Sequence, residues 1–223
     1  DIYTILKEEI VMNEKIENLL KEERKFPPSQ ELMENANATD SWYKDAKRNQ
    51  LEFWQKQALT RISWFKEPTE ILDDSNPPFF KWFKDGELNL SYNCLDRHLE
   101  SDAERVAFYW EGEPGDTQKI TYQELYERVC KLSNALKKLG VEKGDRVAIY
   151  LGMTPEIVVS MLACARIGAV HSVVFGGFSS EALADRINDA KAKTVITADG
   201  AWRRGDIVPL KNNVDGSLEL TNY

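Results

Sequence analysis

The stretch that decides the fold runs from Arg146 to Ala198 and reads RVAIYLGMTPEIVVSMLACARIGAVHSVVFGGFSSEALADRINDAKAKTVITA. Short apolar runs alternate in it with longer segments that carry helix start and stop signals. The predicted elements are strands over 146–151, 169–175 and 193–198, with helices over 155–167 and 180–190 between them. Strands that alternate with helices indicate right-handed βαβ units, so the predicted fold class is α/β with a parallel sheet.

Capping residues set the ends of these helices. Thr154-Pro155-Glu156 starts the first one, with proline at the first helical position, and Gly168 ends it. Ser179 or Ser180 caps the second helix, which continues to Ala190. Because the first helix is apolar almost all round, we expect it to be buried.

A hairpin and a long helix are predicted just before the sheet. Val106 to Trp110 is a predicted strand, and the Gly- and Pro-containing loop 111–118 leads toward Lys119-Ile120. Thr121 then opens a helix, with Glu124 completing a capping box. The apolar stripe of this helix is Leu125, Val129, Leu132, Leu136 and Leu139, and Gly140 ends it.

The N-terminal part has a different character. Residues 1–25 predict an amphipathic helix that packs on the core or on a partner, and Phe26-Pro27-Pro28 ends it. Residues 29–50 are polar with few apolar anchors. Residues 51–100 are rich in aromatic side chains and proline without a sustained period, so we expect an irregular, ordered segment that packs its rings on the rest of the fold.

Composition narrows the class of ligand. The chain has 223 residues, 42% of them hydrophobic, which is ample for a core in one large or two small domains. Its net charge is -8, from 29 basic and 37 acidic residues, and such a charge repels nucleic acid and anionic membranes. We therefore expect neither as a partner, and an anionic ligand needs a local site.

Targeting signals and cysteines bear on the compartment. No apolar stretch approaches the roughly 18 residues that span a bilayer, and the N-terminus lacks the apolar core of a signal peptide. Cys94, Cys130 and Cys164 fit neither a disulfide framework nor a metal knuckle. These features predict a soluble, cytoplasmic protein, and we predict no metal site in it.

Ligands of an open parallel sheet bind beyond the carboxyl ends of its strands. Three predicted loops lie there, Gly152 to Thr154, Phe175 to Ser179 and Asp199 to Gly205. In the second loop, Gly176 and Gly177 permit close backbone approach at a helix N-terminus.

The third loop carries Arg203 and Arg204 beside Trp202. A guanidinium group engages two phosphate oxygens at once, and the indole or the nearby Phe178 ring can stack on a purine. Together the two loops predict a site for a phosphorylated, nucleotide-like ligand. Simpler interpretations stay open, because a Gly-Gly pair is often only a tight connection and an Arg-Arg pair only a solvated loop.

Other catalytic patterns are missing or weak. The sequence has no GxxxxGK[ST], GxGxxG, GxSxG or HExxH motif. Asp73 and Asp74 lie among Pro and Asn and are predicted turn residues. A structural hydrogen bond is the preferred interpretation for His98, and a buried, satisfied side chain for His171.

Three segments carry a resemblance to a known family. They are WFKDGELNLSYNCLDRH over 82–98, VFGGFS over 174–179 and DGAWRRGDIVPLK over 199–211. The first resembles the N-terminal signature of AMP-forming acetyl-CoA synthetases, members of the adenylate-forming enzymes. The second also resembles a segment of these enzymes, and the third resembles their CoA-phosphate loop. The resemblance covers residues 40–223.

The resemblance implies a fold and an activity. Members form an acetyl-adenylate from acetate and ATP, with Mg²⁺, and then transfer the acetyl group to CoA with release of AMP. The implied division is an N-terminal helix and linker over 1–35, the synthetase N-terminal segment over 36–100, and the first part of the AMP-binding α/β domain over 101–223. The chain corresponds to roughly the first third of that architecture.

The resemblance also assigns site residues. Phe175, Gly176 and Gly177 match the segment that lies along CoA, and Arg203 matches the first arginine that contacts its 3'-phosphate. Where many members carry a second basic residue the chain has Asp206, so either Arg204 substitutes or CoA is held more weakly. No phosphate-binding Ser/Thr/Gly-Lys loop, acetate pocket or catalytic lysine is found, so no catalytic residue is assigned and the chain alone is predicted to be inactive.

Other functions stay open at this point. A propionate- or acetoacetate-CoA ligase would share these segments, because the acyl pocket lies elsewhere. A non-catalytic CoA-binding or interaction module is the alternative from another class. Acyl-chain specificity and oligomeric state are not predicted.

Overall fold

The computed structural model describes residues 24–222, and these form two compact units, one over residues 24–53 and one over residues 54–222. A helix was predicted over residues 1–25, and residues 1–23 of it lie outside the described part. In the first unit, Ser29 caps the short helix α2 (Gln30–Glu34), and α3 (Asp40–Arg48) follows. The Trp42 ring meets the edge of the Phe53 ring at 5.9 Å between centroids. Helix α4 (Gln50–Arg61) then follows along the chain.

The aromatic-rich segment is irregular only in its middle. Between α4 and α5 (Leu90–Cys94) the only strands described are the two-residue β1 (Leu72–Asp73) and β2 (Lys81–Trp82). After α5 come the 3-10 turn η1 (Asp96–His98) and α6 (Leu99–Asp102). The helices at both ends of the segment were not expected, because its aromatic residues show no helical period.

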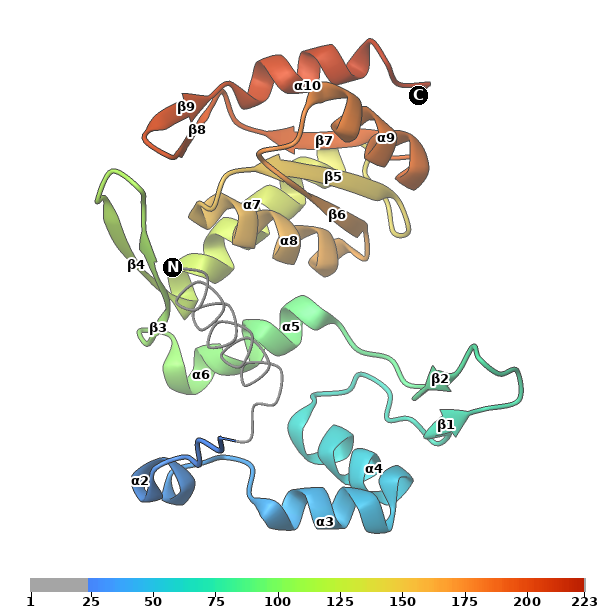
Figure 1. Ribbon diagram of the computed structural model, residues 1–223. Helices are drawn as coiled ribbons and strands as arrows, with labels where there is room; N and C mark the ends of the chain where they lie inside the picture. The colour runs from blue at the N-terminus through green and yellow to red at the C-terminus, as the bar shows by residue number, and fades with distance from the viewer. Residues whose placement is uncertain (1–23, 223) are drawn as a thin grey trace, which may run out of the picture. The chain divides into compact units, whose positions relative to one another are not determined.

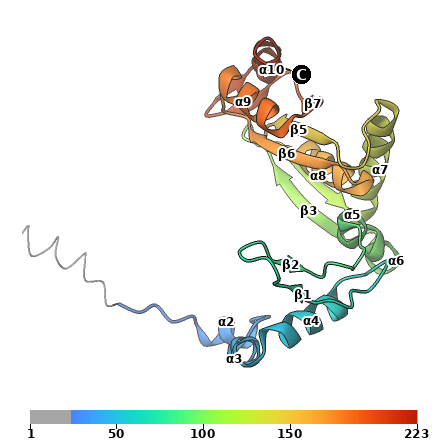
Figure 2. The ribbon, with the colours of Figure 1, turned by 90° about the vertical axis from the view of Figure 1, so that its right-hand side faces the viewer.

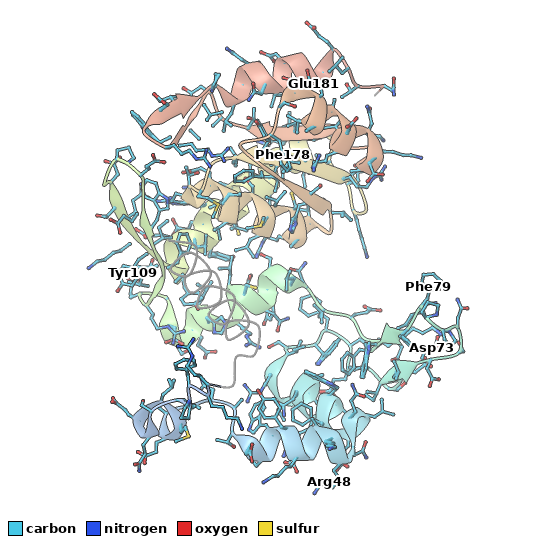
Figure 3. The ribbon with its side chains drawn as sticks, in the orientation of Figure 1. Arg48, Asp73, Phe79, Tyr109, Phe178 and Glu181 are labelled. Atoms are coloured by element: carbon cyan, nitrogen blue, oxygen red, sulfur yellow. The ribbon has the colours of Figure 1, made fainter. Side chains whose placement is uncertain are left out.

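The carboxylates of this segment have structural roles. Asp73, labelled in Figure 3, accepts a hydrogen bond from Lys84 Nζ at 2.7 Å and others from the Ser75 hydroxyl and amide. Lys84 and Ser75 hold the pKa of Asp73 below its usual range. This supports the structural interpretation of Asp73 rather than a catalytic one.

The parallel sheet predicted from the sequence is confirmed. Its strands are β5 (Arg146–Leu151), β6 (Val170–Phe175) and β7 (Thr194–Thr197), arranged in the order β6-β5-β7. The connecting helices are α8 (Pro155–Ile167) and α9 (Ser180–Ala190), labelled in Figure 1. Gly168 ends α8 with φ of 76°, and Ser179 caps α9 by accepting a hydrogen bond from the Ala182 amide.

Two pairs of helices cover the sheet, and β5 divides its side chains between them. Val147, Ile149 and Leu151 pack with α7 (Tyr122–Lys138) and α8. Ala148 and Tyr150 pack with α9 and α10 (Leu210–Leu218) on the opposite face. Figure 2 shows the sheet between the two helix pairs. Because successive side chains of a strand point to opposite faces, one six-residue strand contributes to both cores.

The edge strand β6 is less well covered. Among the described residues it pairs only with β5, on one side. Val170, Val173 and Phe175 are 54%, 45% and 55% exposed. Apolar side chains therefore lie along a strand whose outer backbone groups have no sheet partner in the described chain.

The hairpin before the sheet is also confirmed. β3 (Val106–Glu111) pairs with β4 (Thr117–Thr121) in antiparallel fashion, and Thr121 and Glu124 form the capping box of α7. The prediction that Leu139 belongs to the apolar stripe of this helix is wrong. The helix ends at Lys138, and Leu139 is 76% exposed because it lies beyond the last turn.

The predicted loop 199–205 contains more structure than expected. β8 (Ala201–Arg203) and β9 (Asp206–Val208) form a tight hairpin around Arg204-Gly205, and α10 follows. Arg204 and Gly205 have φ of 56° and 84°, the left-handed pair that a two-residue hairpin turn requires. The loop is thus a short β-ribbon whose residues pair in a defined register, with Arg203 opposite Asp206.

The N-terminal signature is joined to α8 by a charged contact. Arg166 donates two hydrogen bonds of 2.7 Å to the Asp96 carboxylate. The Asn89 side chain donates to the Arg166 carbonyl at the end of the same helix. His98 accepts a hydrogen bond from Arg97 and packs beside Tyr122, consistent with a structural role. His171 lies in β6 and is only half-buried, less than expected.

Residues 24–222 contain no helix long and apolar enough to cross a membrane.

We expect the cysteines to react with iodoacetamide in the order of their exposure. Cys94 is exposed, whereas Cys164 is fully buried in α8 and desolvation raises its pKa from 9.0 to about 11. Alkylation of the native protein at pH 8, followed by mass spectrometry, should label Cys94 first and Cys164 only after opening of the core. Equal labelling of the two in the native state would contradict the packing of α8.

Candidate functional site

The three predicted loops meet in one cavity of about 580 Å³. Its lining includes Gly152 to Thr154 after β5, Phe175 to Gly177 after β6, and Gly200 to Arg203 after β7. All three follow the carboxyl end of a parallel strand, which explains why residues far apart in the sequence converge.

A fourth wall comes from the β3–β4 hairpin, which the sequence did not predict as part of the site. Trp110 to Pro114 and Asp116 line the cavity from this side. The Trp110 indole donates a hydrogen bond of 2.7 Å to the Met153 carbonyl, which fixes the hairpin to the loop after β5. An aromatic side chain with a donor, placed at the end of a strand before a turn, was the only available signal for this contact.

The Arg203 side chain packs against the loop after β6, residues 175–179, which we call the glycine loop. Its guanidinium carbon lies 4.6 Å from the centroid of the Phe175 ring. A Cβ atom on Gly177 would lie 1.5 Å from Arg203 Nη1, so a side chain at this position would displace the guanidinium from its place beside the Phe175 ring. The structure thus brings Phe175, Gly176, Gly177 and Arg203 together at the cavity.

Arg204 is placed differently. It lies at the exposed turn of the β8–β9 hairpin and does not line the cavity. The two adjacent arginines therefore do not form a single clamp, because successive side chains of this hairpin diverge at the turn.

The stacking role considered for Phe178 is disfavoured by its packing. The Arg186 guanidinium covers its ring at 4.3 Å, and the ring packs against the α9–α10 side of the sheet, where Figure 3 labels it. Trp202 lines the cavity and is 52% exposed. Of the two aromatic groups considered, only the indole is available at the cavity.

The buried Tyr150 side chain of β5 holds the glycine loop through a hydrogen bond. Its side chain is fully buried, and its hydroxyl lies 2.7 Å from the Phe178 carbonyl, to which it donates. Asn213 of α10 donates to the same hydroxyl at 3.1 Å. A tyrosine among the aliphatic residues of a buried strand needs such partners, and this was the sequence signal that could have indicated its role.

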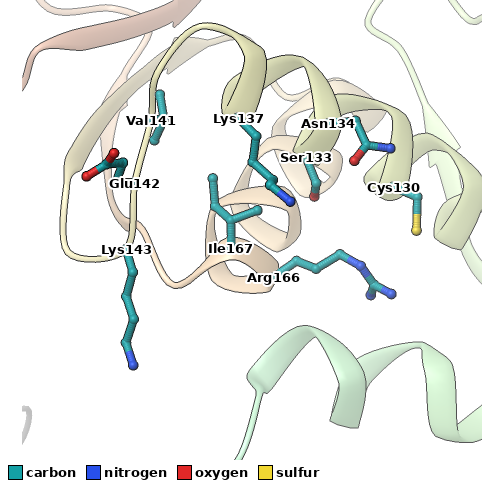
Figure 4. Close-up of a pocket in the computed structure, with 9 residues that line it drawn as sticks. All are labelled: Cys130, Ser133, Asn134, Lys137, Val141, Glu142, Lys143, Arg166 and Ile167. Carbon is teal, nitrogen blue, oxygen red and sulfur yellow. The ribbon is translucent and has the colours of Figure 1, made fainter.

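A second cavity of similar volume lies between the ends of α7 and α8 (Figure 4). It contains Cys130 and the cations Lys137, Lys143 and Arg166. Lys137 and Arg166 lie in the last turns of their helices, where a cation offsets the helix dipole, and Arg166 is already bound to Asp96. No residue of the predicted site lies there, and the charges of Lys137 and Arg166 have structural explanations.

Within residues 24–222, no three His, Cys, Asp or Glu side chains are grouped as a metal ion would require.

Comparison with known sequences gives the class of the protein. The family model of AMP-binding enzymes matches residues 95–220, and the model of the acetyl-coenzyme A synthetase N-terminus matches residues 39–94. The chain belongs to the AMP-binding enzyme family.

Individual relatives narrow this class. The chain is 61% identical over 207 residues to the acetyl-coenzyme A synthetase of Streptomyces avermitilis, covering 92% of this chain and 32% of the relative. It is 55% identical over 195 residues to that of Mycolicibacterium smegmatis, covering 86% and 21%. For Laribacter hongkongensis the identity is 52% over 210 residues, covering 92% and 32%. The resemblance to acetyl-CoA synthetases is confirmed, and the chain spans about a third of the length of most of these relatives.

We expect Tyr150→Phe to loosen the glycine loop. Loss of the hydroxyl leaves the Phe178 carbonyl and the Asn213 amide without this partner, which should lower the free energy of unfolding by about 1 kcal/mol. Amide hydrogen exchange over 176–178 should become faster. Tyr109→Phe, which changes a 71% exposed side chain, is the matched control and should alter neither quantity. Equal effects of the two variants would contradict the role of Tyr150.

Proposed function

We propose that the chain is the N-terminal part of an AMP-forming acetate-CoA ligase and supplies one side of its CoA site. The observation that carries the proposal is the position of Arg203 against Gly177 and Phe175 at a cavity formed by the strand ends. The names of the relatives support the same activity. On this proposal, residues 36–100 form the synthetase N-terminal segment and 101–223 the first part of the AMP-binding domain, with a linker over 1–35.

Each side chain has a physical role in this proposal. The Arg203 guanidinium offers planar donors to the 3'-phosphate of CoA, and its stacking on Phe175 limits the conformational freedom lost on binding. Gly176 and Gly177 leave the backbone accessible, so that an extended ligand can lie along it. Arg204 contributes charge from the turn rather than a direct contact.

The chemistry belongs to the remainder of the ligase. We propose that ATP, Mg²⁺ and acetate bind there, since about two thirds of the relatives' length lies outside the matched region. The acetyl-adenylate would form there and pass its acetyl group to the CoA thiol, with AMP as the leaving group. The residues of this chain hold and orient CoA for that transfer.

Small-molecule partners and a cytoplasmic location complete the proposal. A net charge of -8 disfavours nucleic acid and anionic membranes as partners. The three cysteines are free thiols, as is usual in a reducing compartment.

We expect Arg203→Ala, made in the complete ligase, to raise the KM for CoA. Loss of a charge-assisted contact worth about 1.5 to 3 kcal/mol corresponds to roughly a ten- to hundredfold weaker affinity. The KM values for ATP and acetate and the rate of adenylate formation should change little, because those ligands bind elsewhere.

Two controls separate phosphate recognition from loop support. Dephospho-CoA lacks the 3'-phosphate, so mutant and parent should use it almost equally. Arg186→Ala removes an arginine that also stacks on a phenylalanine but does not line the cavity, and it should leave the KM for CoA unchanged. If Arg203→Ala weakens dephospho-CoA as much as CoA, Arg203 supports the loop and the proposed contact is wrong.

The 223-residue chain alone should catalyse no acetate-dependent ATP-pyrophosphate exchange. Adenylate formation needs positioned phosphate ligands and a cationic clamp, and the sequence contains no loop of that kind. The measurement is incorporation of labelled pyrophosphate into ATP by the purified chain. Exchange above that of a blank preparation would refute the assignment of adenylate formation to the remainder of the ligase.

A further inference from the structure

The turn of the β8–β9 hairpin offers a backbone donor beside the cavity. Arg203 and Asp206 are the last paired residues of the hairpin, so the amides of Arg204 and Gly205 lie in the turn, outside the ladder. Because the ladder does not use these two amides, each needs an acceptor elsewhere, either water or a side chain. Such N–H groups, next to an arginine, suit an anionic acceptor.

A carboxylate of the chain already uses this donor. The Gly205 amide donates a hydrogen bond to the Glu113 side chain, 92 positions earlier in the sequence. Glu113 lies in the loop of the β3–β4 hairpin and lines the cavity. The hydrogen bond from Trp110 to Met153 fixes the loop end of that hairpin, three residues before Glu113, so the carboxylate is brought to the turn by a supported element.

We propose that Glu113 occupies the anion position of the β8–β9 turn and must leave it when a phosphate group binds beside Arg203. The inference rests on the proposed function, and the ligand class is a phosphomonoester on the ribose of a coenzyme. A carboxylate and a phosphate are both anionic acceptors, so they compete for the same N–H group and repel each other across it.

The competition has a consequence for specificity. Because the binding-competent state is the one in which Glu113 has left the turn, the apparent affinity for the phosphorylated ligand is reduced by the fraction of molecules in that state. A ligand without the phosphate does not need the turn and is not affected. Glu113 therefore determines how strongly the site distinguishes phosphorylated from dephosphorylated coenzyme.

The test is Glu113→Gln in the complete ligase, with affinities for CoA and dephospho-CoA measured by titration calorimetry. The amide side chain keeps the size and an acceptor oxygen but loses the charge. We expect CoA to bind about two- to tenfold more tightly and dephospho-CoA to bind as before. Glu113→Asp, which keeps the charge but shortens the reach to Gly205, should also tighten CoA.

Further variants separate the possible outcomes. Glu104→Gln removes the same charge just before the same hairpin, at an exposed residue that does not line the cavity. If this control variant raises the affinity for CoA as much as Glu113→Gln does, the gain comes from the general loss of negative charge and the proposed competition is wrong. If Glu113→Gln leaves CoA unchanged or weakens it while Arg203→Ala still acts only on CoA, the inference is overturned and the proposed function stands. If Arg203→Ala has no effect on CoA, the proposed function itself fails.

Discussion

The burial of β5 on both faces is the constraint on which the rest of the structure depends. Val147 and Ile149 face one helix pair, and Ala148 and Tyr150 face the other. Because the side-chain period of a strand is two, a shift of one residue in pairing would exchange the two sets and bury the wrong volumes on both sides. The register of β5 is thereby fixed, and with it the positions of the loops that follow all three strands.

Tyr150 connects this core to the site. It is the one side chain with a hydroxyl in β5, and a hydroxyl taken out of water without a partner costs roughly 1 to 3 kcal/mol. Its partners are the glycine loop and Asn213, so satisfying a buried group also positions the loop. Arg203 then lies in the space that Gly177 leaves. Placement of the guanidinium is thus a consequence of packing rather than of a direct ion pair.

Local signals made the sheet and its flanking helices predictable. The capping box at Thr121, proline at the start of α8 and glycine at its end all act within a few residues, and each is found where the sequence placed it. The meeting of the three loops followed from a general property of parallel sheets. Four of the five proposed site residues line the cavity for that reason.

Contacts between distant segments could not be predicted in this way. The pairing of Glu113 with Gly205 depends on two hairpins whose relative position no local pattern encodes. Helix α10 was missed because its sequence contains asparagine and glycine, which are weak helix formers, and it is held instead by Leu210 and Val214 in the core. The sequence analysis grouped Arg204 with Arg203 because the two are adjacent. No local pattern showed that the strand ends at Arg203 and that Arg204 lies in the turn.

The open edge of β6 links folding to ligand binding. Phe175 is both the last residue of this edge strand and a wall of the cavity. Any polypeptide segment that adds a strand beside β6 therefore also lies next to Phe175, on whose ring Arg203 stacks. Binding of a ligand in the cavity and pairing of an added strand with β6 are then thermodynamically coupled through Phe175. A ligand that stabilises Phe175 in its place also favours pairing of the added strand, and the added strand favours binding of the ligand to the same extent.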